Sequence, residues 1–105
     1  MAFLSNIFIM SGLKKYKKME KEEIISIMRS FIVQLVPSME SVEIAPSHSL
    51  KEIGLDSIER MEIINSTMEE IGVAIVPKEF IKARNIGDIS EIMQNKLENQ
   101  KQIGG

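Results

Sequence analysis

The segment 54–62, GLDSIERME, holds the residues of this chain that are best placed to do chemistry. Asp56 is a residue type that caps helix N-termini, and Ser57 then falls in the first turn of the following helix. An anion attached to the Ser57 hydroxyl would lie beside free backbone N–H groups and the positive end of the helix dipole. Taken alone, an Asp-Ser pair more often marks a simple helix start, so the surrounding sequence has to decide between the two interpretations.

Residue types that carry catalysis or hold metals are scarce. The single histidine, His48, lies in a Ser-rich stretch and the chain has no cysteine, so neither a Ser-His-Asp arrangement nor a set of His/Cys metal ligands is indicated. We interpret His48 as a solvated loop residue. Gly54 and Gly72 each stand alone and form no Gly-rich phosphate loop. The sequence therefore predicts that the protein is not an enzyme and has no metal site.

Composition limits the fold and the partners. A chain of 105 residues has room for one domain, and Ile- and Met-rich hydrophobic residues with only 5% aromatics favour packed amphipathic helices over a sheet. Residues 1–18 hold four lysines and no acid, which leaves 9 basic against 15 acidic residues in 19–105, a net charge of −6. That charge argues against nucleic acid as a partner and favours basic protein surfaces.

The location of the protein in the cell is predicted from its cysteine content and from the length of its apolar stretches. The absence of cysteine fits a reducing compartment. No stretch reaches the roughly 18 apolar residues that a membrane span needs, and the apolar run 2–10 lacks the layout of a signal peptide. We expect a cytoplasmic protein without a membrane span.

Apolar residues at helical spacing predict three long helices and one short one. The first covers about 20–36 and ends at Pro37, whereas the second begins at Leu55-Asp56-Ser57 and ends near Ile71 at Gly72. A short third helix over 78–82 would open at Pro77, and a fourth would begin near Asn85, which can cap it together with Asp88. The apolar stripes of the long helices are Ile24, Met28, Phe31 and Leu35; Ile58, Met61, Ile64, Met68 and Ile71; and Ile86, Ile89, Met93 and Leu97.

The predicted fold is all-α, a small four-helix bundle with a long loop between helices 1 and 2. A loop of that length tends to be functional, and its apolar residues would pin it across the helices; they are Val42, Ile44, Leu50 and Ile53. Residues 73–76 are predicted to be a buried connector. We expect a disordered leader over 1–18, for which a membrane-surface or docking helix is the alternative, the folded domain over 19–98 and a disordered tail over 99–105.

The sequence around Ser57 resembles the signature of the acyl carrier protein family, a Gly followed by Asp-Ser-Leu at the head of an acidic second helix. This chain has IGLDSIERMEII, with Ile58 in place of the usual Leu, and the resemblance extends over about 20–97. It includes the long first loop, the proline after the second helix and the short third helix. The resemblance implies that Ser57 carries 4′-phosphopantetheine, added from coenzyme A by a phosphopantetheinyl transferase, and that the protein shuttles acyl thioesters, as a monomer, without catalysing a reaction.

The resemblance also implies a partner-docking face on the second helix. Its members would be Asp56, Ile58, Glu59, Arg60, Met61, Glu62 and Glu69. Because exposed charges contribute little to stability, we expect Glu59→Lys and Glu62→Lys to slow modification or acyl transfer with little effect on folding.

A narrower resemblance is to the stand-alone carriers that accompany HMG-CoA-synthase-like cassettes in bacterial polyketide pathways. It rests on Arg60, the triplet 78–80 (KEF) and the run 85–88 (NIGD). It implies delivery of an acetyl or malonyl-derived unit for β-branching, with acyltransferase, ketosynthase or HMG-CoA-synthase-like partners. A fatty-acid carrier, a D-alanyl or peptidyl carrier, and a helical interaction module without a prosthetic arm remain the alternatives.

Overall fold

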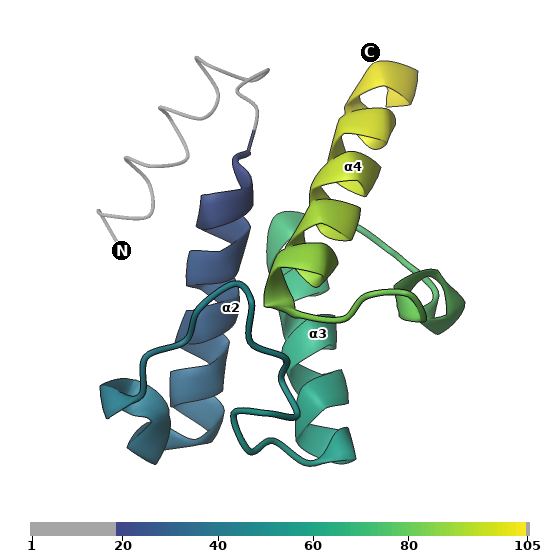
Figure 1. The fold of residues 1–105 in the computed structure, drawn as a ribbon. Coiled ribbons are helices and arrows are strands. Elements are labelled where there is room, and N and C mark those ends of the chain that lie inside the picture. Colours follow the sequence, from purple (N-terminus) through teal and green to yellow (C-terminus); the bar gives the residue numbers. More distant parts are fainter. Residues whose placement is uncertain (1–18, 105) are drawn as a thin grey trace, which may run out of the picture.

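The computed structural model describes residues 19–104, with the side chains of 19–100 (Figure 1). Three α-helices and two 3₁₀ turns make up this part of the chain: α2 (Lys21–Leu35), η1 (Pro37–Ser41), α3 (Ser57–Ile71), η2 (Pro77–Phe80) and α4 (Ile86–Gly104). No strand occurs among the described residues, which confirms the all-α class. Both α3 and α4 pack on α2, so α2 is the central support of the fold.

Helix α2 has the expected limits but a shifted buried face. Glu20 caps it, and its backbone N–H donates to Glu23 Oε1 at 2.8 Å. The fully buried side chains are Ile24, Met28 and Ile32, one every fourth residue. Phe31 and Leu35, which the predicted stripe included, are only partly buried against this core.

The buried row of helix α3 shares only Ile71 with the predicted stripe, of which Ile64 and Met68 are partly buried against the core. Its buried residues are Ile63, Thr67 and Ile71, whereas Ile58 and Met61 are 76% and 61% exposed. The helix carries two apolar rows, and the one that faces α2 includes a threonine. Thr67 can be buried because its Oγ1 donates to the Ile63 carbonyl at 2.8 Å.

The predicted short third helix is a 3₁₀ turn, η2 (Pro77–Phe80), which opens at Pro77 as predicted and ends two residues before the predicted limit at Lys82. Its backbone bonds span three residues, from Glu79 N to Val76 O (3.0 Å) and from Ile81 N to Lys78 O (3.3 Å). The four-helix count was therefore wrong, because this segment is too short to close α-helical turns. In the connector before η2, Val73 and Ile75 are buried while Ala74 and Val76 are exposed, so burial alternates along an extended segment.

The long loop is fastened to the start of α4. The N–H groups of Ile86 and Gly87 donate to the carbonyls of His48 and Pro46, both at 2.9 Å, which gives two N–H groups of the helix end their acceptors. His48 is half-buried and its Nδ1 accepts from Ala45 N–H at 3.0 Å. The expectation of a solvated histidine was wrong, because the loop uses this ring to hold its own turn.

The loop's apolar residues pack unequally. Leu50 is buried, and Ile44 and Ile53 are partly buried against the core, but Val42 is exposed.

The C-terminal helix extends further than the predicted domain limit. Helix α4 continues to Gly104, into the segment 99–105 that the sequence predicts as a disordered tail. The predicted leader, 1–18, lies outside the described residues, and the domain limits as such stay a prediction. Within 19–104, no helix has the length and hydropathy that crossing a bilayer requires.

Candidate functional site

Ser57 is the first residue of α3, and a reciprocal pair of hydrogen bonds fixes the start of that helix. Asp56 Oδ1 accepts from Glu59 N–H at 2.8 Å, and Glu59 Oε1 accepts from Asp56 N–H at 2.9 Å. Ser57 is exposed, and its position puts the hydroxyl beside first-turn N–H groups that have no acceptor within the helix. The local sequence thus builds an open, anion-compatible hydroxyl.

The chain just before Ser57 is anchored in the core. Leu55 is only 3% exposed, and its N–H donates to the Leu50 carbonyl at 3.2 Å. Gly54 turns the chain at φ +105°, a backbone conformation that favours glycine. Arg60, from the first turns of α3, donates through Nη1 to the Leu55 carbonyl at 2.8 Å. The residue before Ser57 is therefore buried and hydrogen-bonded on both sides, although Ser57 follows a long loop.

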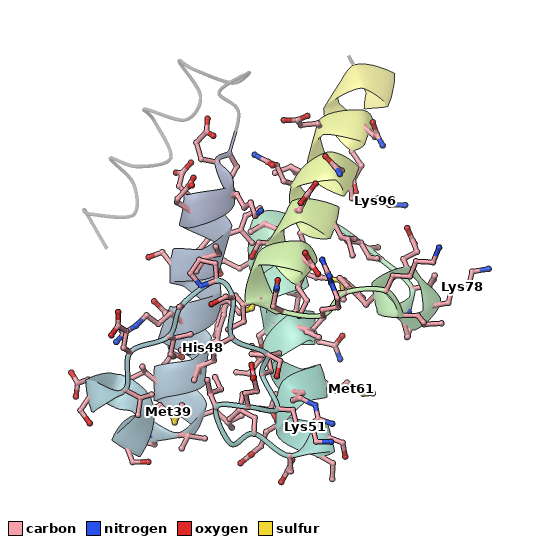
Figure 2. The ribbon with its side chains drawn as sticks, in the orientation of Figure 1. Met39, His48, Lys51, Met61, Lys78 and Lys96 are labelled. Carbon is pink, nitrogen blue, oxygen red and sulfur yellow. The ribbon has the colours of Figure 1, made fainter. Side chains whose placement is uncertain are left out.

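An apolar groove begins at Ser57 and runs between α3 and η2. Its volume is about 250 Å³, and we call it the η2 groove. Met61, one turn after Ser57, forms part of its rim and projects outward from α3 in Figure 2. The full lining is Ser57, Met61, Ile64, Asn65, Met68, Ile75, Pro77 and Phe80.

A second, shallower hollow lies next to the same serine on the exposed side of α3. Ile58, Met61, Glu62 and Asn65 line it together with Ser57. Two exposed apolar side chains beside a carboxylate and an amide form a surface of the kind that partner proteins bind.

The residues predicted to form the docking face separate into three groups. Ile58, Met61 and Glu62 lie together around the hollow beside Ser57. Asp56, Glu59 and Arg60 hold the helix start and the loop end. Glu69 is exposed, but it lies about 18 Å from Ser57 along the helix axis, at a rise of 1.5 Å per residue.

Six residues of the η2 groove were not among the predicted site residues: Ile64, Asn65, Met68, Ile75, Pro77 and Phe80. Asn65 follows Ser57 and Met61 at intervals of four, so helical spacing could have identified it. Phe80 comes from η2 and closes the η2 groove from the other side; no local signal in the sequence places it near Ser57.

No cluster of three or more His, Cys, Asp or Glu side chains within the described residues could hold a metal ion.

Comparisons with known proteins point to the same helix. A family model described as a phosphopantetheine attachment site matches residues 31–93, which include all of α3. The polyketide biosynthesis acyl-carrier-protein AcpK of Bacillus subtilis (strain 168) is 28% identical over 81 residues, which cover 77% of this chain and 99% of that protein. The crystal structure of the curacin biosynthetic pathway HMG synthase in complex with acetyl donor-ACP contains a chain that is 33% identical. The TM-score is 0.68, and the alignment covers 74% of the present chain and 100% of the other.

Proposed function

The chain belongs to the phosphopantetheine attachment family, and from this premise we propose that it is an acyl carrier protein that bears its 4′-phosphopantetheine on Ser57 and serves polyketide β-branching. One observation carries the assignment to Ser57. It is an exposed serine, the first residue of α3, held between a reciprocal capping pair and the mouth of an apolar groove.

The residues around Ser57 fit the prosthetic group. A phosphodiester on Ser57 Oγ would meet the N–H groups of the first turn and the positive end of the helix dipole. The η2 groove opens at the same residue and offers apolar contacts from Met61 and Phe80 to an attached arm. When bound, the group supplies a thiol that holds an acyl group as a thioester.

The protein's own contribution is to present the arm and to be recognised. The capping pair of Asp56 and Glu59 keeps the first turn of α3 in place. Ile58, Met61 and Glu62 form the exposed surface that a partner enzyme would contact near Ser57. The chain acts as a carrier, and its partners perform the chemistry.

The identity of those partners is proposed from the relatives. The curacin relative is described as an acetyl donor in complex with an HMG synthase, and AcpK as a polyketide carrier. We propose an HMG-synthase-type enzyme as the principal partner, with a phosphopantetheinyl transferase required for loading and an acyltransferase or ketosynthase supplying the acyl group. A monomeric state and a cytoplasmic location stay predictions.

The attachment site is tested by incubating the apo protein with coenzyme A and a broad-specificity phosphopantetheinyl transferase. Intact mass spectrometry should show the gain of one phosphopantetheine in the wild type and none in Ser57→Ala. Ser47→Ala, which removes another exposed serine in the loop, is the matched control and should load normally. A mass gain that persists in Ser57→Ala would reject Ser57, and an unmodified wild type would favour an interaction module without an arm.

The same preparation, loaded from acetyl-coenzyme A, tests the pathway. Acetyl transfer from the loaded carrier to an HMG-synthase-type enzyme is expected. Transfer to a fatty-acid ketosynthase alone would instead support the fatty-acid alternative.

A further inference from the structure

The side-chain amide of Asn65 belongs to the row of α3 that begins at Ser57. Ser57, Met61 and Asn65 follow one another at intervals of four, and all three line both the η2 groove and the hollow beside Ser57. Residues at this spacing lie one above the other on one face of a helix. Asn65 therefore lies on the edge between the groove and the hollow, about two turns beyond the attachment site.

The amide of Asn65 is unusual within the η2 groove. Among the described residues that line the groove, only Ser57 and Asn65 have polar side chains. Asn65 is exposed, and its amide forms no hydrogen bond with any residue that the structure describes. In ligand pockets with mostly apolar walls, a few polar groups fix the orientation of the ligand. The amide is therefore available to hold one polar point of a chain that enters the groove at Ser57.

The arm that Ser57 would carry has such polar points, because it contains a hydroxyl and two amides in an otherwise aliphatic chain. An amide that leaves water for an apolar groove is destabilised unless it finds a hydrogen-bond partner there. Beyond Ser57 itself, Asn65 is the side chain of the groove lining that can supply this partner. The methylene groups of the arm can contact Met61 and Phe80.

The distance along α3 selects the second amide of the arm, the one nearer the thiol. Asn65 lies about 12 Å from Ser57 along the helix axis, at a rise of 1.5 Å per residue. An extended chain advances roughly 1.2 Å per bond, and the second carbonyl carbon is about ten bonds, or about 12 Å, from the Ser57 oxygen. The first carbonyl carbon, after about six bonds, reaches only about 7 Å. The thiol lies about 5 Å beyond the second amide, level with Met68, the next groove residue along α3.

We propose that Asn65 is a positioning residue for the arm: its Nδ2–H donates to the carbonyl of the arm's second amide and holds the arm in the η2 groove. This inference rests on the proposed function and adds to it the residue that orients the arm. The hydrogen bond places the thioester beside Met68. Asn65 contacts the arm and not the reacting atoms, so it determines where the thioester lies and takes no part in acyl transfer.

The test observes this contact directly on the full chain, labelled with ¹⁵N and ¹³C and loaded by the transferase from unlabelled coenzyme A. Isotope-filtered NMR should show nuclear Overhauser effects from the Asn65 side-chain NH₂ to the arm methylenes on either side of the second amide. Similar effects should join the Met68 methyl group to the methylenes next to the thiol. Because the hydrogen bond joins two neutral groups, these contacts should persist at high salt.

Variants separate the hydrogen bond from the shape of the groove. Asn65→Leu keeps the approximate size of the side chain but removes the donor. The ratio of docked to free arm, measured from the Met68 contacts, should fall roughly five-fold, the usual effect of losing one hydrogen bond. Asn65→Gln keeps an amide and should retain the contact with the arm. Asn95→Leu is the matched control and should leave the ratio unchanged, because Asn95 is an exposed asparagine of α4 that lines neither the groove nor the hollow.

A change in the arm tests the other partner of the hydrogen bond. The protein is loaded from a coenzyme A analogue in which an alkyl segment of equal length replaces the second amide. The Met68 contacts of this arm should be the same in the wild type and in Asn65→Leu, because the pair that the substitution breaks is already absent. A further loss in Asn65→Leu would mean that Asn65 acts on another part of the arm.

Absence of contacts between Asn65 and the arm in the holo form would overturn the inference, as would unchanged Met68 contacts in Asn65→Leu. Equal losses in Asn65→Leu and Asn95→Leu would show a general effect on the helices. Contacts of Asn65 that arise only on adding an HMG-synthase-type enzyme would assign the amide to that partner. Intact mass is recorded first, so failure to load counts against the proposed function and not against Asn65, and circular dichroism confirms that each variant is folded.

Discussion

At the scale of single residues, Asp56 and Glu59 have a structural role that their surface position conceals. Each side chain accepts the other residue's backbone N–H, at 2.8 and 2.9 Å. A Glu59→Lys substitution therefore removes a capping interaction as well as a charge. The expectation that it would leave folding nearly unaffected does not suit this position, and Glu62, which lines the hollow beside Ser57, is the cleaner site for a charge reversal.

Replacing Asp56 by alanine should lower the free energy of unfolding by about 1 kcal/mol, the usual cost of losing a helix N-cap. The reason is that Glu59 N–H loses its acceptor in the first turn of α3. Urea denaturation followed by circular dichroism measures the change. Asp56→Asn, which keeps an acceptor oxygen, should retain most of the stability. Equal midpoints for the wild type and Asp56→Ala would mean that the cap contributes nothing.

At the scale of elements, the start of α4 is held by Asp88 and by the long loop. Asp88 N–H donates to Asn85 Oδ1 at 2.8 Å, so Asn85 caps the helix as predicted. The Asp88 carboxylate accepts from Arg84 N–H at 2.9 Å rather than from Asn85, which places the second bond one residue earlier than in a standard capping box. The backbone N–H of Arg84 is the main reason that the pKa of Asp88 is lowered from 3.8, and the Arg84 side chain lowers it further.

A titration of the Asp88 carboxyl by NMR should give a midpoint below 3.8. Because this pKa is lower in the folded state, the carboxylate stabilises the fold above its unfolded pKa of about 3.9. That contribution is lost as the pH falls through the folded pKa. Arg84→Ala should raise the midpoint only in part, since the backbone N–H remains. A return to 3.8 or above in this variant would assign the effect to the guanidinium instead.

The limits of α3 could be predicted from the sequence because local chemistry sets them. Asp56 caps the helix, and Gly72 ends it at φ +82°. Which face is buried could not be predicted, since Ile58 and Ile63 both belong to apolar rows and only packing against α2 decides between them. Ser57 likewise follows from a local motif. The position of Phe80 in the η2 groove does not, because only the tertiary fold brings η2 against α3.

At the scale of the whole molecule, the net charge and the local face of α3 make separable contributions to partner binding. Residues 19–105 carry a net charge of −6, which steers the protein toward any basic partner at long range. Glu62 lies beside Ser57 on α3. Glu40 is exposed in η1, which follows the C-terminal end of α2 and lies on the other side of α2 from α3 in Figure 1. Substituting either glutamate by lysine changes the net charge equally.

Glu62→Lys should lower kcat/KM for modification by the transferase several-fold at low salt, and Glu40→Lys should lower it much less. Steering by net charge predicts equal losses, but a contact beside Ser57 predicts a loss confined to Glu62. Rates measured from low salt to about 1 M, where the Debye length falls to about 3 Å, should converge as screening removes the electrostatic part. Thermal unfolding of both variants serves as a control for folding. Equal slowing by the two substitutions would leave net charge as the sole electrostatic determinant and would remove the acidic docking face from α3.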